Sequence, residues 1–240
     1  MEIWDFGATS MAMQLAFLLF PGVTQLDLTG PVQFLSRLPG AKVDLVWDSL
    51  EPVPTDAGFS IMPTATFADL PSADLLCVPG GMGVASVINH DRALDWVRRV
   101  GTEAEWVTSV CTGALILGAA GLLQGYKATT HWAWHDLLAL FGAEPVQARY
   151  VIDRNRATGG GVTAGIDFAL ALMARIAGED HARAVQLGME YDPNPPFDSG
   201  SPAKAGPELV EVYRRRAAKL APGREAELIA AAVRLGFTAA

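Results

Sequence analysis

Hydrophobic residues in this chain gather into short runs that are separated by glycine turns and by helical patterns. Four runs are apolar along most of their length, as in strands buried within a parallel sheet: 14–20, 42–47, 74–78 and 106–110. Helical patterns alternate with them, ending near Leu38, Thr102 and Ala120, and again over 131–141 and 163–177. This alternation predicts an α/β fold with a mostly parallel sheet and helices on both faces.

Local signals predict where some of these elements begin and turn. Pro31 suits the first turn of the first helix, with Thr29 near its cap position. Proline, glycine and threonine residues over 52–66 predict a short hairpin at the edge of the sheet. A second hairpin is predicted around Arg154 and Asn155.

The last third of the chain is expected to be helical. A proline-rich loop over 192–202 interrupts it, and residues 207–235 carry an amphipathic helical pattern with many charged side chains. We therefore expect one α/β domain over 13–190, with a loop and C-terminal helices over 191–240 packed on it. Residues 1–12 are expected to be an N-terminal extension.

The overall composition narrows the range of partners and compartments. Half of the 240 residues are hydrophobic and 18% are charged, which is enough apolar surface for a sizeable core. The formal net charge of −8 argues against nucleic acid or an anionic membrane as a partner. No apolar run reaches the ~18 residues of a membrane span, and the first residues lack a signal-peptide pattern. Two cysteines do not make a disulfide framework, and we predict a cytoplasmic protein.

One cysteine, Cys111, stands where a predicted strand meets a predicted helix. The run 106–110 ends at this residue, and a small-residue helical pattern starts at once. A nucleophile-type side chain on such a turn has the geometry of a nucleophile elbow, and the helix N-terminus would favour a thiolate. Cysteine is also common as a buried structural residue. We expect Cys111 to be functional and Cys77, inside an apolar run, to belong to the core.

Two further features follow predicted core strands at the edge where parallel sheets collect their reactive groups. Asp27 either caps the following helix or faces a cleft, where burial would raise its pKa. Gly80 and Gly81 form either a simple tight turn or a pair of amide donors that complete an anion pocket with the amide of Thr112. The glycines do not match a dinucleotide-binding pattern.

Two histidines, His131 and His135, are spaced so that they would share one face of a helix. Trp132 stands where a zinc-protease helix has glutamate, so we expect no metal site there. His131 opens the helix and is a candidate for the wall of the site.

These motifs together resemble a known family. The matching segments are 25–31, 78–81, 109–113, 128–132 and 158–167, and they resemble the ThiJ/PfpI superfamily and, within it, the isocyanide hydratases. The similarity covers residues 13 to about 235. It implies a flavodoxin-like sandwich that forms a homodimer and needs no metal or organic cofactor.

The resemblance also implies a reaction. Cys111 would be the nucleophile, Asp27 would be the general acid and base, and Thr112 stands where the protease-like branch has histidine. Peptidase activity is therefore not expected. The implied activity is hydration of a small-molecule isocyanide to an N-formamide through a covalent thioimidate on Cys111.

The resemblance implies positions for substrate binding as well. Gly80 and Gly81 match the backbone donors of the family, and His131 could line the site. The turn 159–161 would bring Val162 beside the thiol.

Three other functions stay open. A glyoxalase-like enzyme of the superfamily would use the same cysteine, but its site usually has a glutamate and a histidine where this chain has Asp27 and Thr112. A ligand-sensing domain related to AraC-type regulators shares the sandwich, although residues 203–240 are too few for two DNA-binding modules. A redox protein that responds to oxidation of Cys111 is the third.

Overall fold

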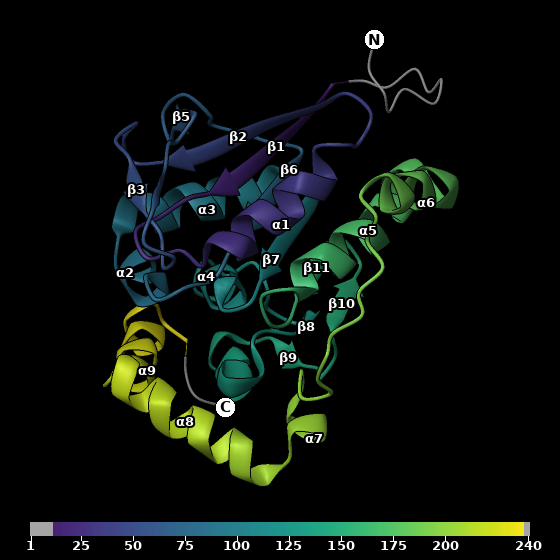
Figure 1. Ribbon diagram of the computed structural model, residues 1–240. Helices are drawn as coiled ribbons and strands as arrows, with labels where there is room; N and C mark the ends of the chain where they lie inside the picture. Colours follow the sequence, from purple (N-terminus) through teal and green to yellow (C-terminus); the bar gives the residue numbers. More distant parts are fainter. Residues whose placement is uncertain (1–11, 238–240) are drawn as a thin grey trace.

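A seven-stranded sheet forms the centre of the protein, in the order β10-β11-β7-β6-β1-β2-β5 (Figure 1). The computed structural model describes residues 12–237. The strands are β1 (Met13–Leu18), β2 (Ala41–Trp47), β5 (Ala65–Thr66), β6 (Leu75–Val78), β7 (Trp106–Val110), β10 (Tyr150–Asp153) and β11 (Arg156–Gly159). All neighbours are parallel except β10 and β11, which form the hairpin expected around Arg154. The expected mostly parallel sheet is confirmed.

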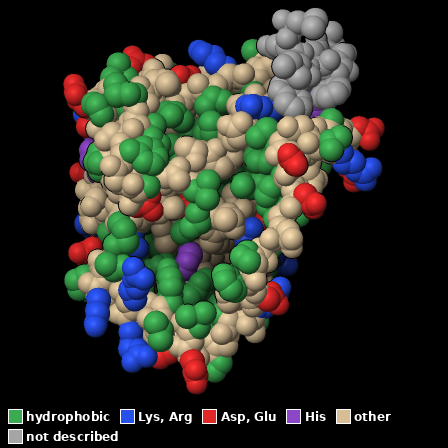
Figure 2. All heavy atoms as spheres, viewed as in Figure 1, with side chains coloured by type: hydrophobic (Ala, Val, Ile, Leu, Met, Phe, Trp, Pro, Cys, Tyr) green, Lys and Arg blue, Asp and Glu red, His purple; other side chains and the backbone are tan. Residues whose placement is uncertain are grey.

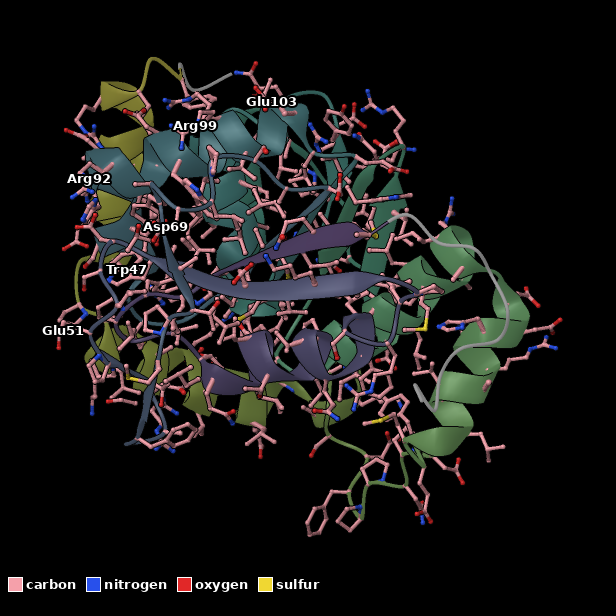
Figure 3. The ribbon with its side chains drawn as sticks, turned by 90° about the horizontal axis from the view of Figure 1, so that it is seen from above. Trp47, Glu51, Asp69, Arg92, Arg99 and Glu103 are labelled. Atoms are coloured by element: carbon pink, nitrogen blue, oxygen red, sulfur yellow. The ribbon has the colours of Figure 1, made fainter. Side chains whose placement is uncertain are left out.

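Helices cover both faces of this sheet. On one face α1 (Gln25–Leu35) packs against α5 (Ala164–Ala177), and on the other α3 (Asp91–Glu103) contacts α2 (Val84–Ile88) and α4 (Gly113–Ala119). Figure 3 shows α1 and α3 on opposite sides of the sheet, with Arg99 and Glu103 directed away from it. The apolar residues of α3 are buried, so this helix presents one face to the core and one to solvent.

The central strands are buried because both faces of the sheet are covered. Every residue from Leu15 to Phe20 is fully shielded from solvent, and so are Leu75 to Val78 of β6. Cys77 lies in that segment, which confirms that it is a core residue. Continuous apolar runs of this kind supply most of the hydrophobic stabilisation of a parallel α/β fold.

The first helix begins earlier than its proline indicates. α1 starts at Gln25 with Thr24 as the N-cap, and Pro31 lies inside the helix. The prediction of a start near Pro31 and Thr29 is therefore wrong. The helix tolerates the proline although it loses one backbone hydrogen bond there. A Cβ at Gly165 of α5 would lie 3.0 Å from the Pro31 ring, so the ring fills the space between the two helices. As a result Asp27 falls in the first turn of α1.

The segment after Thr130 is a 3-10 helix, η1 (Trp132–Phe141), which ends at Gly142 as the pattern predicts. His131 is its N-cap, and its Nδ1 accepts a hydrogen bond from the amide of Ala133 at 3.2 Å. A 3-10 helix has three residues per turn, so residues four apart do not share a face. The prediction that His131 and His135 lie on one helix face is therefore wrong.

The hairpin expected over 52–66 is present but forms its own sheet. β3 (Val53–Pro54) and β4 (Ser60–Ile61) pair with each other, whereas β5 is the edge strand of the main sheet. A further small sheet joins β8 (Lys127–Ala128) to β9 (Glu144–Pro145).

The C-terminal third continues through α6 (Glu179–Gly188), α7 (Pro202–Ala205), α8 (Pro207–Leu220) and α9 (Arg224–Arg234). The amphipathic pattern over 207–235 thus forms two helices, because Gly223 takes a left-handed conformation between them. α9 packs on α2 and η1. Figure 1 shows α8 and α9 below the sheet. Within residues 12–237, none of the helices combines the length and the apolar character needed to cross a membrane.

One residue tests how firmly α9 is attached. Leu228 is fully buried, whereas Ile229 on the same helix is 43% exposed. Leu228→Ala is expected to lower the free energy of unfolding by about 2–4 kcal/mol, because it removes buried methyl groups and leaves a cavity. Ile229→Ala is the matched control, with an expected change within about 0.5 kcal/mol. Urea titration followed by circular dichroism measures both, and equal midpoints for the two variants would contradict the docking of α9.

Candidate active site

Four segments that follow neighbouring strands meet at the carboxyl edge of the sheet. They are the first turn of α1 after β1, the Gly80-Gly81 turn after β6, Cys111 after β7, and the 159–161 turn after β11. Hydrogen bonds join them: Gly80 donates to Asp27, Gly81 donates to Thr112, and the Cys111 amide donates to Gly160. The strand order places these four ends side by side, as expected for a parallel sheet.

Cys111 has the backbone conformation of a nucleophile elbow. Its φ angle is +54°, in the left-handed region, which costs a residue other than glycine about 1–2 kcal/mol. Hydrogen bonds hold this conformation on both sides. The Cys111 amide donates to the carbonyl of Gly160 at 2.8 Å, and the Thr130 hydroxyl donates to the Cys111 carbonyl at 2.6 Å. Gly113 is required two residues later, because a Cβ there would collide with the carbonyl groups of Val78 and Pro79.

The Asp27 side chain is turned away from its own helix and into the site. It is fully buried, and its Oδ2 accepts a hydrogen bond from the amide of Gly80 at 3.0 Å. Of the two alternatives for this residue, the structure therefore has the carboxyl group that faces the site. Burial raises the pKa of Asp27 to about 7, while the hydrogen bonds from Gly80 and from the Cys111 thiol act in the opposite direction.

The environment of Cys111 favours the thiol over the thiolate. The side chain is 7% exposed, and burial, followed by the nearby charge of Asp27, raises the pKa of the thiol well above its usual value. The amide and hydroxyl of Thr112 act in the opposite direction but do not outweigh these two effects. The helix N-terminus thus acts in the expected direction, toward the thiolate, but burial and the charge of Asp27 outweigh it. A neutral thiol beside a carboxylate can still transfer its proton as it reacts.

The amides of Gly80 and Gly81 are used inside the site. Gly80 donates to Asp27, and the Gly81 amide donates to the Thr112 hydroxyl at 3.1 Å. The anion pocket was one of the two alternatives for these glycines, and the structure has their amides holding the two polar side chains beside Cys111. Gly80 cannot carry a side chain, because a Cβ there would lie 2.6 Å from the Thr112 nitrogen and 2.9 Å from Oδ2 of Asp27.

Aromatic residues and an arginine from distant parts of the chain lie near Cys111. Tyr213 of α8 stacks on His131, with ring centroids 5.8 Å apart, and also contacts Trp132. Burial, followed by the charge of Cys111, raises the pKa of Tyr213, whereas burial lowers the pKa of Arg224 in α9 against the effect of Cys111. Sequence reasoning missed both, because nothing local distinguishes them from other residues of amphipathic helices.

His131 and Val162 lie on neighbouring segments. A Cβ at Gly161 would be 3.5 Å from the His131 ring, and Val162 is the next residue, in the turn between β11 and α5. Burial lowers the pKa of His131 to about 4, with a further contribution from Arg224, so the ring is neutral near pH 7. Figure 2 shows a hollow in which a histidine side chain lies among hydrophobic side chains. Roles for His131 and Val162 in binding stay predictions.

Between residues 12 and 237, no group of three or more His, Cys, Asp or Glu side chains could hold a metal ion.

Comparisons with known proteins give a consistent picture. The model of the DJ-1/PfpI family matches residues 13–175. An isonitrile hydratase from Pseudomonas putida is 56% identical over 208 residues, which cover 87% of this chain and 91% of that protein. The HTH-type transcriptional regulator GbdR of Pseudomonas aeruginosa is 30% identical over 189 residues, which cover 74% of this chain and 50% of the regulator.

A solved structure agrees with these sequences. The crystal structure of a ThiJ/PfpI family protein from Pseudomonas syringae matches this chain with a TM-score of 0.87 and 44% identity, and the match covers 92% of this chain and 91% of that one. The resemblance inferred from the motifs is thereby confirmed. With its elbow cysteine, its buried carboxyl group and a family match over most of its length, the chain belongs to the DJ-1/PfpI family.

Proposed function

We propose that this protein is an isocyanide hydratase, a lyase that adds water to R–N≡C and gives the N-substituted formamide. The observation that carries the mechanism is the buried pair formed by Cys111 and Asp27, in which the pKa of the carboxyl group is about 7. The substrate class is supported by 56% identity over most of both chains to an isonitrile hydratase, isonitrile being another word for isocyanide.

In the first half of the reaction, Asp27 as carboxylate takes the proton of the Cys111 thiol while the sulfur attacks the terminal carbon of the isocyanide. A carbon–sulfur bond forms, and the same carbon gathers electron density. Asp27 then returns its proton to that carbon, which gives a covalent thioimidate, R–N=CH–S–Cys111. A carboxyl group with a pKa near 7 suits both transfers, because it accepts and releases a proton with little cost near neutral pH.

In the second half, a water molecule attacks the thioimidate carbon. Asp27, again a carboxylate, takes a proton from the water and passes it to the substrate nitrogen, which restores the carboxylate. The tetrahedral species then collapses: the carbon–sulfur bond breaks, the hydroxyl proton passes through Asp27 to the sulfur, and R–NH–CHO leaves. The hydroxyl of Thr112, held by the Gly81 amide, would orient Cys111 during these steps.

A ligand sensor is the second candidate. It is supported by 30% identity over 189 residues to a transcriptional regulator, of which this chain covers half. Turnover of an aryl isocyanide, compared with methylglyoxal under the same conditions, separates a hydratase from a sensor and from a glyoxalase-like enzyme. The homodimer and the cytoplasmic location implied by the resemblance and the composition stay predictions.

Cys111→Ala is expected to abolish conversion of an aryl isocyanide to its formamide, because no other group can form the thioimidate. The control is Cys77→Ala, which removes the buried core thiol and is expected to keep kcat within about three-fold of wild type. Formamide production followed by chromatography measures both. Turnover by a folded Cys111→Ala protein would rule out the covalent mechanism.

Asp27→Asn is expected to lose most of the activity and to gain stability at alkaline pH. In the wild type, kcat/KM should rise with pH through about 7, as Asp27 becomes a proton acceptor. The folded pKa of about 7 exceeds the ordinary 3.8, so the contribution of this group to stability is full below pH 4 and is lost as pH rises through 7. Asparagine does not ionise, so Asp27→Asn is expected to raise the free energy of unfolding at pH 8 by up to about 4 kcal/mol relative to wild type.

Urea titrations at pH 4 and pH 8 measure the effect on stability, and kcat for an aryl isocyanide measures the effect on activity. Asp95→Asn, on the exposed side of α3, is the control. The control should change neither activity nor the pH dependence of stability. An Asp27→Asn protein with wild-type kcat would restrict the carboxyl group to a structural role.

Thr112→Val and Thr112→Ser separate the hydroxyl from the backbone of this residue. Valine leaves the buried Gly81 amide without its acceptor and is expected to lower kcat by about ten-fold or more. Serine keeps the hydroxyl and should stay within about three-fold of wild type. Equal kcat values for the two variants would leave only the Thr112 amide with a role.

A further inference from the structure

The first residue of α9 is a buried cation that reaches the turn supporting Asp27 and Thr112. Arg224 is 7% exposed. Its Nη2 donates a hydrogen bond to the Gly81 carbonyl, its Nη1 lies 3.9 Å from the sulfur of Met82, and its guanidinium lies 5.0 Å from the Trp134 ring centroid. Each arm of the guanidinium therefore has its own partner.

Arg224 has no carboxylate partner at ion-pair distance among residues 12–237. Burying a cation without an opposite charge beside it is costly. The negative groups that act on Arg224 are Cys111 when ionised, Glu227 on its own helix and Tyr213 of α8. The site thus contains a buried positive charge that responds to ionisation of Cys111.

The carbonyl that Arg224 holds belongs to the turn that carries the site. The Gly81 amide donates to the Thr112 hydroxyl, and the amide one residue earlier donates to Asp27. The turn packs closely on the segment that leads into α1, because a Cβ at Gly81 would lie 2.6 Å from the Thr24 nitrogen. A change at Arg224 therefore acts on both side chains that contact Cys111.

We propose that Arg224 is a positioning residue, through which α9 holds the Gly80-Gly81 turn against the Cys111–Asp27 pair and offsets the negative charge of Cys111 during turnover. The expected effect on kcat rests on the proposed function. The expected effect on the reactivity of the Cys111 thiol does not. Lysine cannot replace it fully, since a single ammonium group supplies the charge without the two separate arms.

The experiment compares Arg224→Met, Arg224→Lys and a control, Arg234→Met, in the full chain with Cys77→Ala so that Cys111 is the remaining thiol. Arg234 lies at the other end of α9 and donates to the Ile88 carbonyl and to Asn89, so it attaches the same helix without contacting the site. The readouts are the rate of Cys111 alkylation by iodoacetamide between pH 6 and 10, and kcat and KM for an aryl isocyanide.

Arg224→Met is expected to slow alkylation at pH 7 by about ten-fold, to shift its midpoint to higher pH, and to lower kcat by a similar factor with KM within about three-fold. Arg224→Lys should recover part of both losses, and Arg234→Met should match wild type within about two-fold. The remaining titratable groups near the thiol are Asp27, His131 and Tyr213. His131 is neutral throughout this range because its pKa is about 4.

A folded Arg224→Met protein that behaves like Arg234→Met in both readouts would overturn the proposal. If Arg224→Met does not fold, Arg224→Lys decides: a several-fold loss of kcat relative to Arg234→Met supports the role, and an unchanged kcat overturns it. Alkylation needs no isocyanide. Slower alkylation in a protein that hydrates no isocyanide would therefore reject the proposed function while keeping the role of Arg224.

Discussion

The hydrogen bond from the Gly80 amide to the Asp27 carboxyl group is the interaction on which the site depends. It joins the first turn of α1 to the end of β6, and it is possible because β1 and β6 are neighbours in the sheet. A buried carboxyl group with a single backbone donor is poorly compensated for lost water, which is why its pKa lies near neutrality. Burial of this carboxyl group lowers the stability of the fold, and it also places a proton that can exchange near neutral pH beside Cys111.

The sequence predicted the sheet, the elbow and the grouping of Asp27, Gly80 and Cys111, because continuous apolar runs and a cysteine at a strand end carry local signals. It did not predict the direction of the glycine amides, since the partner of a backbone donor depends on which side chains converge in space. The start of α1 was placed too late because Pro31 resembles a helix start, whereas here it packs on another helix. Arg224 had no local signal at all: it is one of 18 basic residues, and its carbonyl partner is 143 residues away along the chain.

The C-terminal helices lie outside the part of the chain that the family model matches. The family model ends at residue 175, whereas Tyr213 and Arg224, whose pKa values respond to the charge of Cys111, lie beyond it. The conserved architecture of such folds sets the strand ends, and segments outside it adjust polarity and access around them. His131 is neutral and stacked on Tyr213, so an aromatic contact joins the start of η1 to α8.

The crowding at Gly80 has a consequence for how this site can change over time. A Cβ at that position would meet the nitrogen and hydroxyl of Thr112 and the carboxyl group of Asp27 within 2.9 Å, so three positions from three segments share one small volume. Enlarging any one of them requires a smaller residue, or a displaced turn, at another. Substitutions at positions 27, 80 and 112 should therefore be strongly non-additive, and evolutionary or engineered routes to a new activity at this elbow must change them together.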